Sequence, residues 1–393
     1  MDYSFADRIS SLQPSVIREI LKFSSVPGMI SFAAGNPAPE AFPTEQLAKI
    51  SAEIYKERPI DALQYSVTEG YTPLRNALKS RYSYLLGGGD ELIITSGAQQ
   101  VMHLATKSLC NEGDVIICEK PSFIGSLNAF RSFNAKLVGV ELERDGMNIE
   151  MLEAALKENP NAKFIYVIPN FQNPAGICTS LEKRKAIYQL AKQYGVMILE
   201  DNPYGDTRFE GEEIPSIKSF DEDGIVIYAG SFSKVISPGL RVGYAIAPAP
   251  VIAKMTVCKQ ISDVHTSIYS QLLVHEFLTG GQFEQHLLSI KEIYRKKCGL
   301  MCSLFEEKLS PYVTFEKPQG GLFIWCTLPD GIDMMSFCKA AVERNVAVVP
   351  GSAFLTDESQ PCNSFRTNFS TPTDEQIVNG VDILSKLLSE IAK

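Results

Sequence analysis

The chain has few of the features that mark membrane, secreted or nucleic-acid-binding proteins. Its 393 residues include 37 Lys and Arg against 46 Asp and Glu, a formal net charge of −9. That balance disfavours nucleic acid as a partner, because backbone phosphates bind basic surfaces. No apolar run is long enough to span a bilayer, and the first eight residues are too acidic for a secretion signal. We therefore expect a cytoplasmic protein with no nucleic-acid or membrane partner.

The sequence also lacks the usual signatures of metal and nucleotide sites. Its nine cysteines are odd in number and scattered, which is typical of reduced thiols. Cys298 and Cys302 are spaced to meet one turn apart on a helix, which suits either metal ligation or core packing. No histidine lies at a finger-like spacing from them, so core packing is favoured and no metal is predicted. Neither a G-x-G-x-x-G fingerprint nor a G-x-x-x-x-G-K-[ST] loop is present.

Short apolar runs alternate with amphipathic helical stretches through the middle of the chain. Such runs predict strands buried on both faces of a mostly parallel sheet. Thr72 precedes Pro73 as a helix cap, Thr179 and Glu182 form a capping box, and Gly195 ends that second helix. The pattern predicts a doubly wound α/β domain. The expected strands are residues 92–95, 115–118, 164–168, 196–199, 225–228 and 244–246.

The length of the chain favours two domains over one core. After about residue 283 a long helix (283–309), a helix (334–345) and a strand (346–349) follow one another, which predicts a smaller α+β domain. We expect a large domain over 46–282 and a small domain over 283–393. The arm 1–45 is expected to join the small domain, with the active site between the two.

The most informative segment follows the run that ends at Tyr228. It holds Ser231, Ser233, Lys234 and, seven residues further on, Arg241. A lysine can form a Schiff base with an aldehyde, while hydroxyls and an arginine suit a phosphate. The segment thus favours a phosphorylated aldehyde cofactor. The alternative is a solvated loop with chance basic residues.

Three more segments follow predicted strands. Asp201 could pair with a protonated pyridine nitrogen, with Tyr204 and Asn173 near the ring oxygen. Residues 95–100 join a strand to a helix whose first amides suit a phosphate. Each segment alone also reads as an ordinary turn. Together, at the carboxyl ends of strands, they indicate one cofactor site.

These motifs, with residues 14–19, 64–70 and 364–369, resemble those of fold-type I pyridoxal-phosphate (PLP) aminotransferases of class I/II. The similarity runs nearly end to end and is greatest to the branch of 2-aminoadipate, kynurenine and aromatic aminotransferases. The resemblance implies a large PLP-binding domain, a small domain built from both chain ends, and a homodimer with composite active sites. It also implies transfer of an amino group from an amino acid to a 2-oxo acid, with 2-oxoglutarate the expected acceptor.

The resemblance assigns roles to individual residues. Lys234 would be the Schiff-base lysine and the acid/base at Cα, and Asp201 the partner of the pyridine nitrogen. The other expected cofactor ligands are Tyr204 and Asn173 at the ring hydroxyl, Phe123 on the ring, and Ala98, Gln99, Ser231, Ser233, Arg241 and the neighbouring subunit's copy of Tyr65 at the phosphate.

Substrate contacts are implied in the same way. Arg366 would bind the substrate's α-carboxylate, with Gly35 and Asn173 close by. Arg18 would bind a carboxylate in the substrate's side chain. The alternative is that Arg18 lies on the solvent-exposed face of an amphipathic helix and has no role in binding. Two positions depart from the family pattern: Phe123 replaces a frequent tyrosine, and Asn36 replaces a frequent leucine. A β-lyase on the same fold is an alternative function. An aminotransferase-like sensor domain is another, which the acidic charge and the short segment before residue 46 disfavour.

Overall fold

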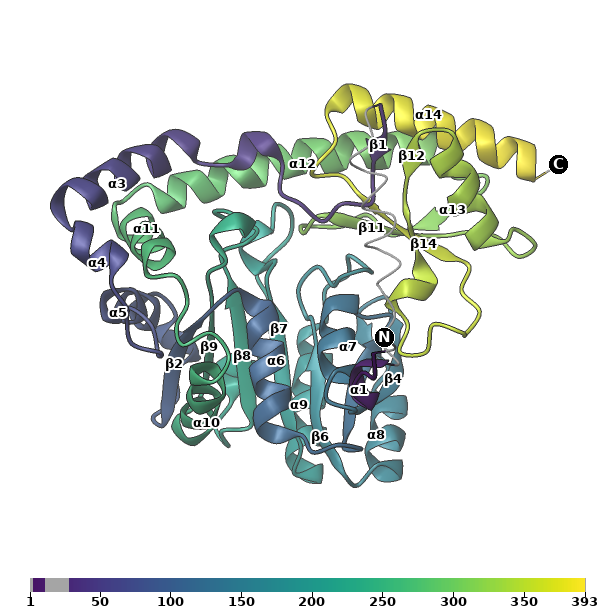
Figure 1. Ribbon diagram of the computed structural model, residues 1–393. Helices are drawn as coiled ribbons and strands as arrows, with labels where there is room; N and C mark the ends of the chain where they lie inside the picture. Colours follow the sequence, from purple (N-terminus) through teal and green to yellow (C-terminus); the bar gives the residue numbers. More distant parts are fainter. Residues whose placement is uncertain (1–2, 11–27, 393) are drawn as a thin grey trace.

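The structure is a computed structural model that describes residues 3–10 and 28–392. Its centre is an eight-stranded sheet in the order β2-β9-β8-β7-β6-β3-β4-β5. Strands β8, β7, β6, β3 and β4 run parallel, while β9 is antiparallel to both β2 and β8. The predicted mostly parallel sheet is confirmed (Figure 1). The strands are β2 (Asp90–Thr95), β3 (Val115–Lys120), β4 (Lys136–Glu143), β5 (Gly146–Met147), β6 (Ala162–Val167), β7 (Met197–Asn202), β8 (Val226–Ser231) and β9 (Gly243–Pro248).

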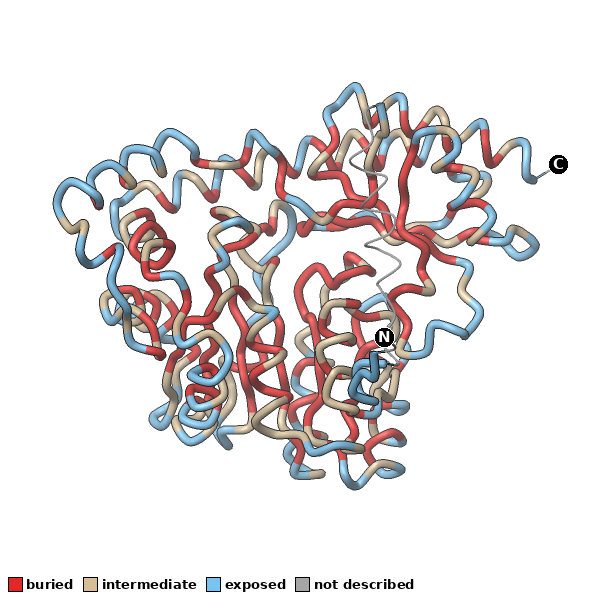
Figure 2. The backbone as a smooth tube through the Cα atoms, viewed as in Figure 1, coloured by how far each residue is buried: buried red, intermediate tan, exposed pale blue. Residues whose placement is uncertain are grey.

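Successive side chains of the central strands enter two different cores. On β6, Phe164 and Tyr166 join the cluster that contains residues of α6 and α7, whereas Ile165 and Val167 join the cluster with α8 and α9. This alternation explains why the strands are apolar throughout, because both faces of the sheet are covered. Figure 2 shows the resulting buried centre. The four helices are α6 (Ala98–Leu109), α7 (Ile124–Arg131), α8 (Ile149–Glu158) and α9 (Leu181–Tyr194).

A second, smaller sheet contains strands from the end of the chain. It has the antiparallel order β10-β11-β14-β13, and beside it β1 (Ile30–Ser31) pairs in parallel with β12 (Val346–Ala347). The segment around β1 thus lies beside the carboxyl-terminal part of the chain, and α12 runs along the top of the molecule beneath α14 (Figure 1). The boundaries of the two domains stay a prediction. The elements of this part are β10 (Thr314–Phe315), β11 (Phe323–Thr327), β13 (Val349–Pro350), β14 (Ser364–Asn368), α12 (Phe283–Lys308), α13 (Met334–Glu343) and α14 (Asp374–Ile391).

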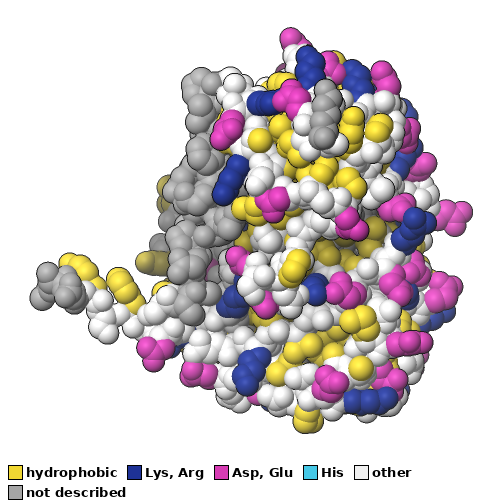
Figure 3. Space-filling view, turned by 90° about the vertical axis from the view of Figure 1, so that its right-hand side faces the viewer, with side chains coloured by type: hydrophobic (Ala, Val, Ile, Leu, Met, Phe, Trp, Pro, Cys, Tyr) yellow, Lys and Arg dark blue, Asp and Glu magenta, His cyan; other side chains and the backbone are white. Residues whose placement is uncertain are grey.

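The remaining helices flank the large sheet or connect its strands. They are α1 (Asp7–Ser10), α3 (Thr44–Glu57), α4 (Pro59–Leu63), α5 (Thr72–Arg81), α10 (Ala249–Gln260) and α11 (Ile268–Thr279), with short 3₁₀ turns η1 (Pro39–Ala41), η2 (Ser83–Leu85), η3 (Gly205–Thr207), η4 (Ile217–Phe220), η5 (Pro238–Leu240) and η6 (Gly351–Phe354). Within residues 3–10 and 28–392, no helix combines the length and the apolar character needed to cross a membrane. On the face drawn in Figure 3, basic and acidic side chains are interspersed.

Three local sequence predictions were wrong. Tyr71, not Thr72, is the N-cap of α5, and its side chain makes no capping hydrogen bond. The cap of α9 is Ser180, whose hydroxyl accepts from the Lys183 amide, so Thr179 and Glu182 are each one place out of register for a capping box. The predicted strand 346–349 is divided between two pairings, as β12 and β13. The end of α9 at Gly195, in a left-handed conformation, is confirmed.

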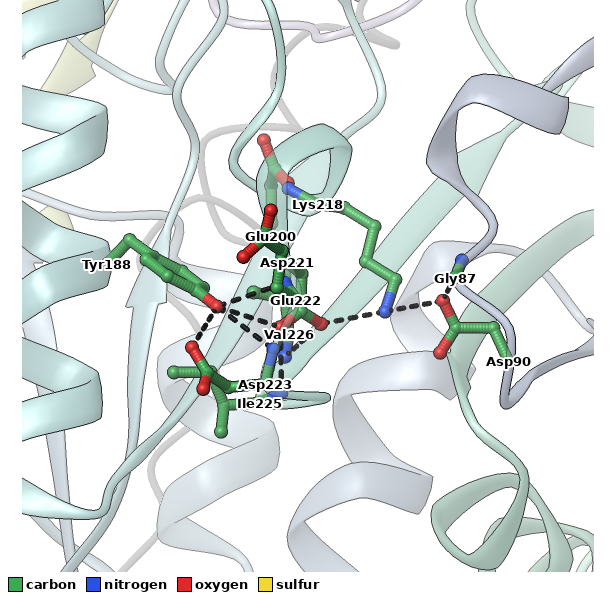
Figure 4. A network of polar contacts seen from close by, with 10 residues as sticks. All are labelled: Gly87, Asp90, Tyr188, Glu200, Lys218, Asp221, Glu222, Asp223, Ile225 and Val226. Atoms are coloured by element: carbon green, nitrogen blue, oxygen red, sulfur yellow. Dashed lines mark hydrogen bonds and ion pairs between the residues drawn. The ribbon is translucent and has the colours of Figure 1, made fainter.

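A buried ion pair joins the edge of the sheet to the turn that leads into β8. Lys218 Nζ lies 2.8 Å from carboxylate oxygens of both Asp90 and Asp221, and all three side chains are at most 5% exposed. Figure 4 shows the lysine reaching from η4 to Asp90, the first residue of β2. Glu200 accepts the Lys218 backbone amide at 2.8 Å. These contacts connect the first residue of β2, strand β7 and the turn that precedes β8.

Candidate active site

A cavity of about 420 Å³ lies at the carboxyl ends of β6, β7 and β8. Its walls come from these strand ends, from α6 and α7, and from the smaller sheet. The structure brings together in it every predicted site residue except Tyr65 and Arg18. Those in the lining are Gly35, Ala98, Gln99, Phe123, Asn173, Asp201, Tyr204, Ser231, Ser233, Lys234, Arg241 and Arg366.

Lys234 lies three residues beyond the end of β8. Its amine donates a hydrogen bond to the carbonyl oxygen of Gly35 at 2.7 Å, so it contacts the segment that leads out of β1. Burial of the amine, with the positive charges of Arg366 and Arg241, lowers the pKa of Lys234 to about 8. The neutral amine is therefore accessible near neutral pH, as a nucleophile or a proton acceptor requires.

Asp201 is the fifth residue of β7, and its side chain is buried. Burial raises the pKa of Asp201 to about 7. The hydroxyl of Tyr166 donates to its Oδ2 at 2.8 Å, whereas its Oδ1 is buried without a hydrogen-bond partner among the described residues. A buried carboxylate oxygen left unpaired is costly. The structure thus presents a carboxylate that lacks one positive or donating partner at the wall of the cavity.

Arg366, in the middle of β14, is buried with its guanidinium in the cavity. It donates from one nitrogen to Asn173 Oδ1 at 2.7 Å and from another to the Ala33 carbonyl at 2.8 Å. Its guanidinium carbon lies 4.0 Å from the centre of the Phe323 ring. Burial lowers the pKa of Arg366 to about 10, which leaves it cationic at neutral pH. Its Nε is buried without a hydrogen-bond partner among the described residues, so the guanidinium keeps a donor for an anionic ligand.

Asn173 and Tyr204 form the wall between Arg366 and Asp201. The Asn173 amide donates to the Tyr204 hydroxyl at 3.3 Å, while its oxygen accepts from Arg366. Arginine is only a donor, so this contact fixes which end of the amide faces which neighbour. Burial raises the pKa of Tyr204 above its ordinary value, which keeps the hydroxyl protonated.

The start of α6 forms a cup with Arg241. Gly97, with φ of +81°, precedes the helix, and a Cβ there would lie 2.4 Å from an Arg241 nitrogen. A Cβ on Gly243 would lie 2.7 Å from the Ala98 amide nitrogen, and one on Gly230 would overlap Tyr244. The first amides of a helix have no intrahelical partner and attract anions. The cup therefore combines free amides, a guanidinium and the nearby Ser231 and Ser233 hydroxyls around a place suited to a phosphate.

Among the described residues, one predicted site residue lies elsewhere. Tyr65 is 82% exposed and packs edge-on against His265 at 5.8 Å between ring centres. It does not line the cavity of its own chain as the described residues define it. Arg18 lies outside the described residues. Phe123 lines the cavity, which agrees with a ring-stacking place but does not test that role.

Two supports of the site were missed from the sequence. Tyr166 lies inside a predicted strand, where it reads as apolar filler, and Ser126 lies on α7, which no motif singled out. Their hydroxyls are 2.8 Å apart. Tyr166 is the only residue with a side-chain hydroxyl in its apolar run of residues 164–168, which is the one signal that could have drawn attention to it.

The Cys298 and Cys302 thiols are buried in the core, with their sulfurs 3.8 Å apart.

Comparison with known proteins identifies the family. The family model described as aminotransferase class I and II matches residues 27–384. Aromatic-amino-acid aminotransferase 1 of Thermococcus litoralis is 38% identical over 403 residues, covering 100% of this chain and 96% of its own. The kynurenine aminotransferase structure from Pyrococcus horikoshii is 35% identical, covers 99% of this chain and 98% of its own, and has a TM-score of 0.95.

A third relative has a solved complex. The alpha-aminoadipate aminotransferase of Thermus thermophilus, complexed with N-(5'-phosphopyridoxyl)-L-leucine, is 36% identical, covers 99% of this chain and 98% of its own, and has a TM-score of 0.91. These likenesses confirm the predicted fold type and the predicted branch. Because the family model spans most of the chain and a 38% identical relative covers all of it, the chain belongs to the class I and II aminotransferases.

Proposed function

We propose that the chain uses pyridoxal 5'-phosphate, bound through Lys234, to move an amino group from an amino acid to a 2-oxo acid. The observation that carries the proposal is the pairing, in one cavity, of a lysine with a lowered pKa and a buried carboxylate with an unpaired oxygen. Aminotransfer itself follows from the family. The cofactor is supported by the phosphopyridoxyl compound in the Thermus thermophilus relative.

The residues of the cavity fit this cofactor at three points. Asp201 Oδ1, buried without a partner among the described residues, suits a protonated pyridine nitrogen. The cup of Gly97, Ala98 and Arg241, in which a Cβ on Gly97 would lie 2.4 Å from an Arg241 nitrogen, suits a phosphate. The amine of Lys234 suits the aldehyde. Asn173 and Tyr204, which are proposed to bind the ring hydroxyl, lie between these points.

When bound, the cofactor supplies an electron sink for charge that develops at the substrate's Cα. The protein residues supply position and proton transfer. Arg366 would hold the α-carboxylate with two parallel hydrogen bonds, since its guanidinium is oriented by Asn173 and Ala33. The Nζ of Lys234, with a pKa of about 8, would accept the proton from the substrate's Cα and then donate it to the carbon of the cofactor that carried the aldehyde. Phe123 and Phe323 line the cavity and would keep water from the reacting atoms.

The substrate range is proposed from the relatives, whose names include aromatic, kynurenine and aminoadipate enzymes. Arg366 accounts for a carboxylate that all amino acids share and does not choose among them. Arg18 is proposed to receive an acidic side chain, and 2-oxoglutarate is the proposed amino acceptor. The exposed Asn36 lines the cavity and would border the substrate.

We also propose a homodimer in which the neighbouring subunit's copy of Tyr65 completes the phosphate cup. Supporting this, exposed apolar side chains lie on α4 and on the loop after it, which carries Tyr65, and also on α10 and the turn that leads to His265; a second subunit would cover them. The loop packs against that turn through the contact between Tyr65 and His265. The exposed apolar residues of these two regions are Ile60, Leu63, Val67, Val257, Ile261 and Val264.

Two experiments test the proposed function. Borohydride reduction of the yellow protein should fix the chromophore to Lys234, as mapped by mass spectrometry, and Lys234→Ala should abolish the adduct. An adduct on another lysine, or no chromophore after incubation with the cofactor, would contradict the proposal. A screen of amino donors with 2-oxoglutarate should yield glutamate. Release of ammonia and pyruvate from β-substituted donors without glutamate formation would instead indicate a β-lyase.

A further inference from the structure

The buried hydroxyl of Tyr166 bonds to Asp201, and a second buried hydroxyl bonds in turn to that of Tyr166. Tyr166 lies on β6, next to β7, and its hydroxyl donates to Asp201 Oδ2 at 2.8 Å. The hydroxyl of Ser126, on α7, lies 2.8 Å from the same Tyr166 oxygen. Ser126 and Tyr166 are fully buried, and Asp201 is 4% exposed. These contacts link α7 to β6 and β6 to β7, and the chain of hydroxyls ends on one oxygen of the Asp201 carboxylate.

The direction of these hydrogen bonds follows from their chemistry. An ionised carboxylate only accepts, so the single proton of the Tyr166 hydroxyl points to Asp201. The Tyr166 oxygen is then an acceptor, and Ser126 must donate to it. The result is a directed chain from Ser126 to Tyr166 to Asp201, in which each bond polarises the next.

Other roles of Tyr166 do not require its hydroxyl. Its ring packs edge-on against Phe130 at 5.2 Å between ring centres, a contact that phenylalanine would preserve. Glu119, another buried carboxylate of this region, accepts from the Ile168 amide and from Gln172. Those donors satisfy Glu119 without the tyrosine, so the hydroxyl serves Asp201.

We propose that Tyr166 is a positioning residue that fixes Asp201 by Oδ2, so that Oδ1 alone remains to meet the ring nitrogen of the cofactor. The proposal deepens the proposed function and rests on it. Without the tyrosine hydroxyl the carboxylate can rotate about its own side chain, and its two oxygens become equivalent as partners. The hydrogen bond also holds the pKa of Asp201 below the value that burial alone would give it. The titratable groups that interact electrostatically with Asp201 are Tyr166, Tyr204 and Glu119.

Tyr166→Phe tests the proposal, with Tyr228→Phe as the matched control. Tyr228 is also a buried tyrosine of the sheet, on β8, but its hydroxyl bonds to Asn202 at 2.8 Å and not to Asp201. In the cofactor-free protein, a ¹³C-labelled aspartate signal, assigned to Asp201 by its loss in Asp201→Asn, should titrate at a higher pH in Tyr166→Phe than in the wild type. In Tyr228→Phe it should not move.

The loaded enzyme gives a second readout. With cofactor labelled with ¹⁵N at the ring nitrogen, the nitrogen signal should shift in Tyr166→Phe, and kcat should fall by about 10- to 100-fold with little change in KM, as loss of a hydrogen bond to a charged group would do. Ser126→Ala should move both signals in the same direction by less, and it replaces Tyr166→Phe if that variant does not fold.

Two results would overturn the proposal: an unchanged Asp201 titration in Tyr166→Phe, or an equal change in the Tyr228→Phe control. Failure of the wild type to bind the labelled cofactor is a different outcome. It would remove the proposed function and with it the role assigned to Tyr166, whereas a normal holoenzyme with an unmoved Asp201 signal removes only the positioning role.

Discussion

The guanidinium of Arg366 donates to Asn173 Oδ1 at 2.7 Å, and so joins strand β14 of the small sheet to the loop that follows β6 in the large one. The two residues are 193 positions apart in the sequence. Because the amide oxygen is taken by Arg366, the amide nitrogen is left for Tyr204. This one hydrogen bond therefore orients the Arg366 guanidinium and also determines that the Asn173 amide nitrogen, not its oxygen, faces Tyr204.

Arg366→Lys should lower kcat/KM for every amino donor by about 10- to 100-fold, because an ammonium cannot form two parallel bonds to a carboxylate and would also release Asn173. Steady-state kinetics with an acidic and an aromatic donor measures this. Arg344→Lys, at an exposed ion pair with Glu390, is the control and should be neutral. A loss confined to one donor class would contradict the role in binding the shared carboxylate.

Asp201→Asn should slow the chemical step far more than it weakens substrate binding. Its amide would no longer favour a protonated ring nitrogen, a loss felt mainly in the transition state. Single-turnover kinetics on the loaded variant measures the step directly. Near-normal rates with cofactor bound would show that the carboxylate has another task.

The lowered pKa of Lys234 makes a prediction for the cofactor-free protein. Since the folded state binds this proton less tightly than the unfolded chain, burial of the charge destabilises the fold fully below pH 8, and the cost fades between about pH 8 and the ordinary lysine pKa of 10.5. Lys234→Met should therefore raise Tm at pH 7, and the difference should shrink as the pH rises toward 10. Capture of the cofactor by the wild type should accelerate through pH 8. A pH-independent difference in Tm would contradict the assignment.

Lys218→Met should destabilise the protein by about 3–5 kcal/mol, because it leaves Asp90 and Asp221 buried without their shared cation. Urea denaturation of the two proteins at equal pH measures the difference. Lys192→Met is the control: that lysine is 53% exposed and pairs with Asp223 at the surface, so its loss should cost at most about 1 kcal/mol. Equal losses in both variants would show that the burial of Lys218 adds nothing.

Arg18→Ala should reduce kcat/KM for acidic donors such as 2-aminoadipate by about 10- to 100-fold and leave aromatic donors nearly unchanged, as loss of one charge-assisted pair would do. Arg18 lies outside the described residues, so kinetics on the two donor classes is the test. Equal losses for both classes would assign it to the solvated face of a helix.

The predicted residues that the structure brings into one cavity share a physical cause, although their roles stay a prediction. Lys234 and Asp201 follow apolar runs. A polar residue at the end of a buried parallel strand lies at the carboxyl edge of the sheet, where such sheets bind ligands. Tyr166 could not be found this way, because a tyrosine inside an apolar run is also common as a core side chain with no role at a site. The cap of α9 was misplaced by one residue because Thr179 and Ser180 both carry hydroxyls, and only the backbone decides between them. The antiparallel direction of β9 leaves no mark in an apolar run of three residues.

The crowding around Gly97, Gly230 and Gly243 has a consequence for redesign. A methyl group on Gly230 or Gly243 would overlap Tyr244 or the Ala98 amide, and one on Gly97, whose φ is +81°, would press on Arg241, so these three positions resist substitution. Variation meant to alter the substrate range by directed evolution should therefore be directed to Asn36, which lines the cavity and is proposed to border the substrate. We expect the three glycines to stay unchanged in any variant that keeps the cofactor, while the residue at position 36 varies.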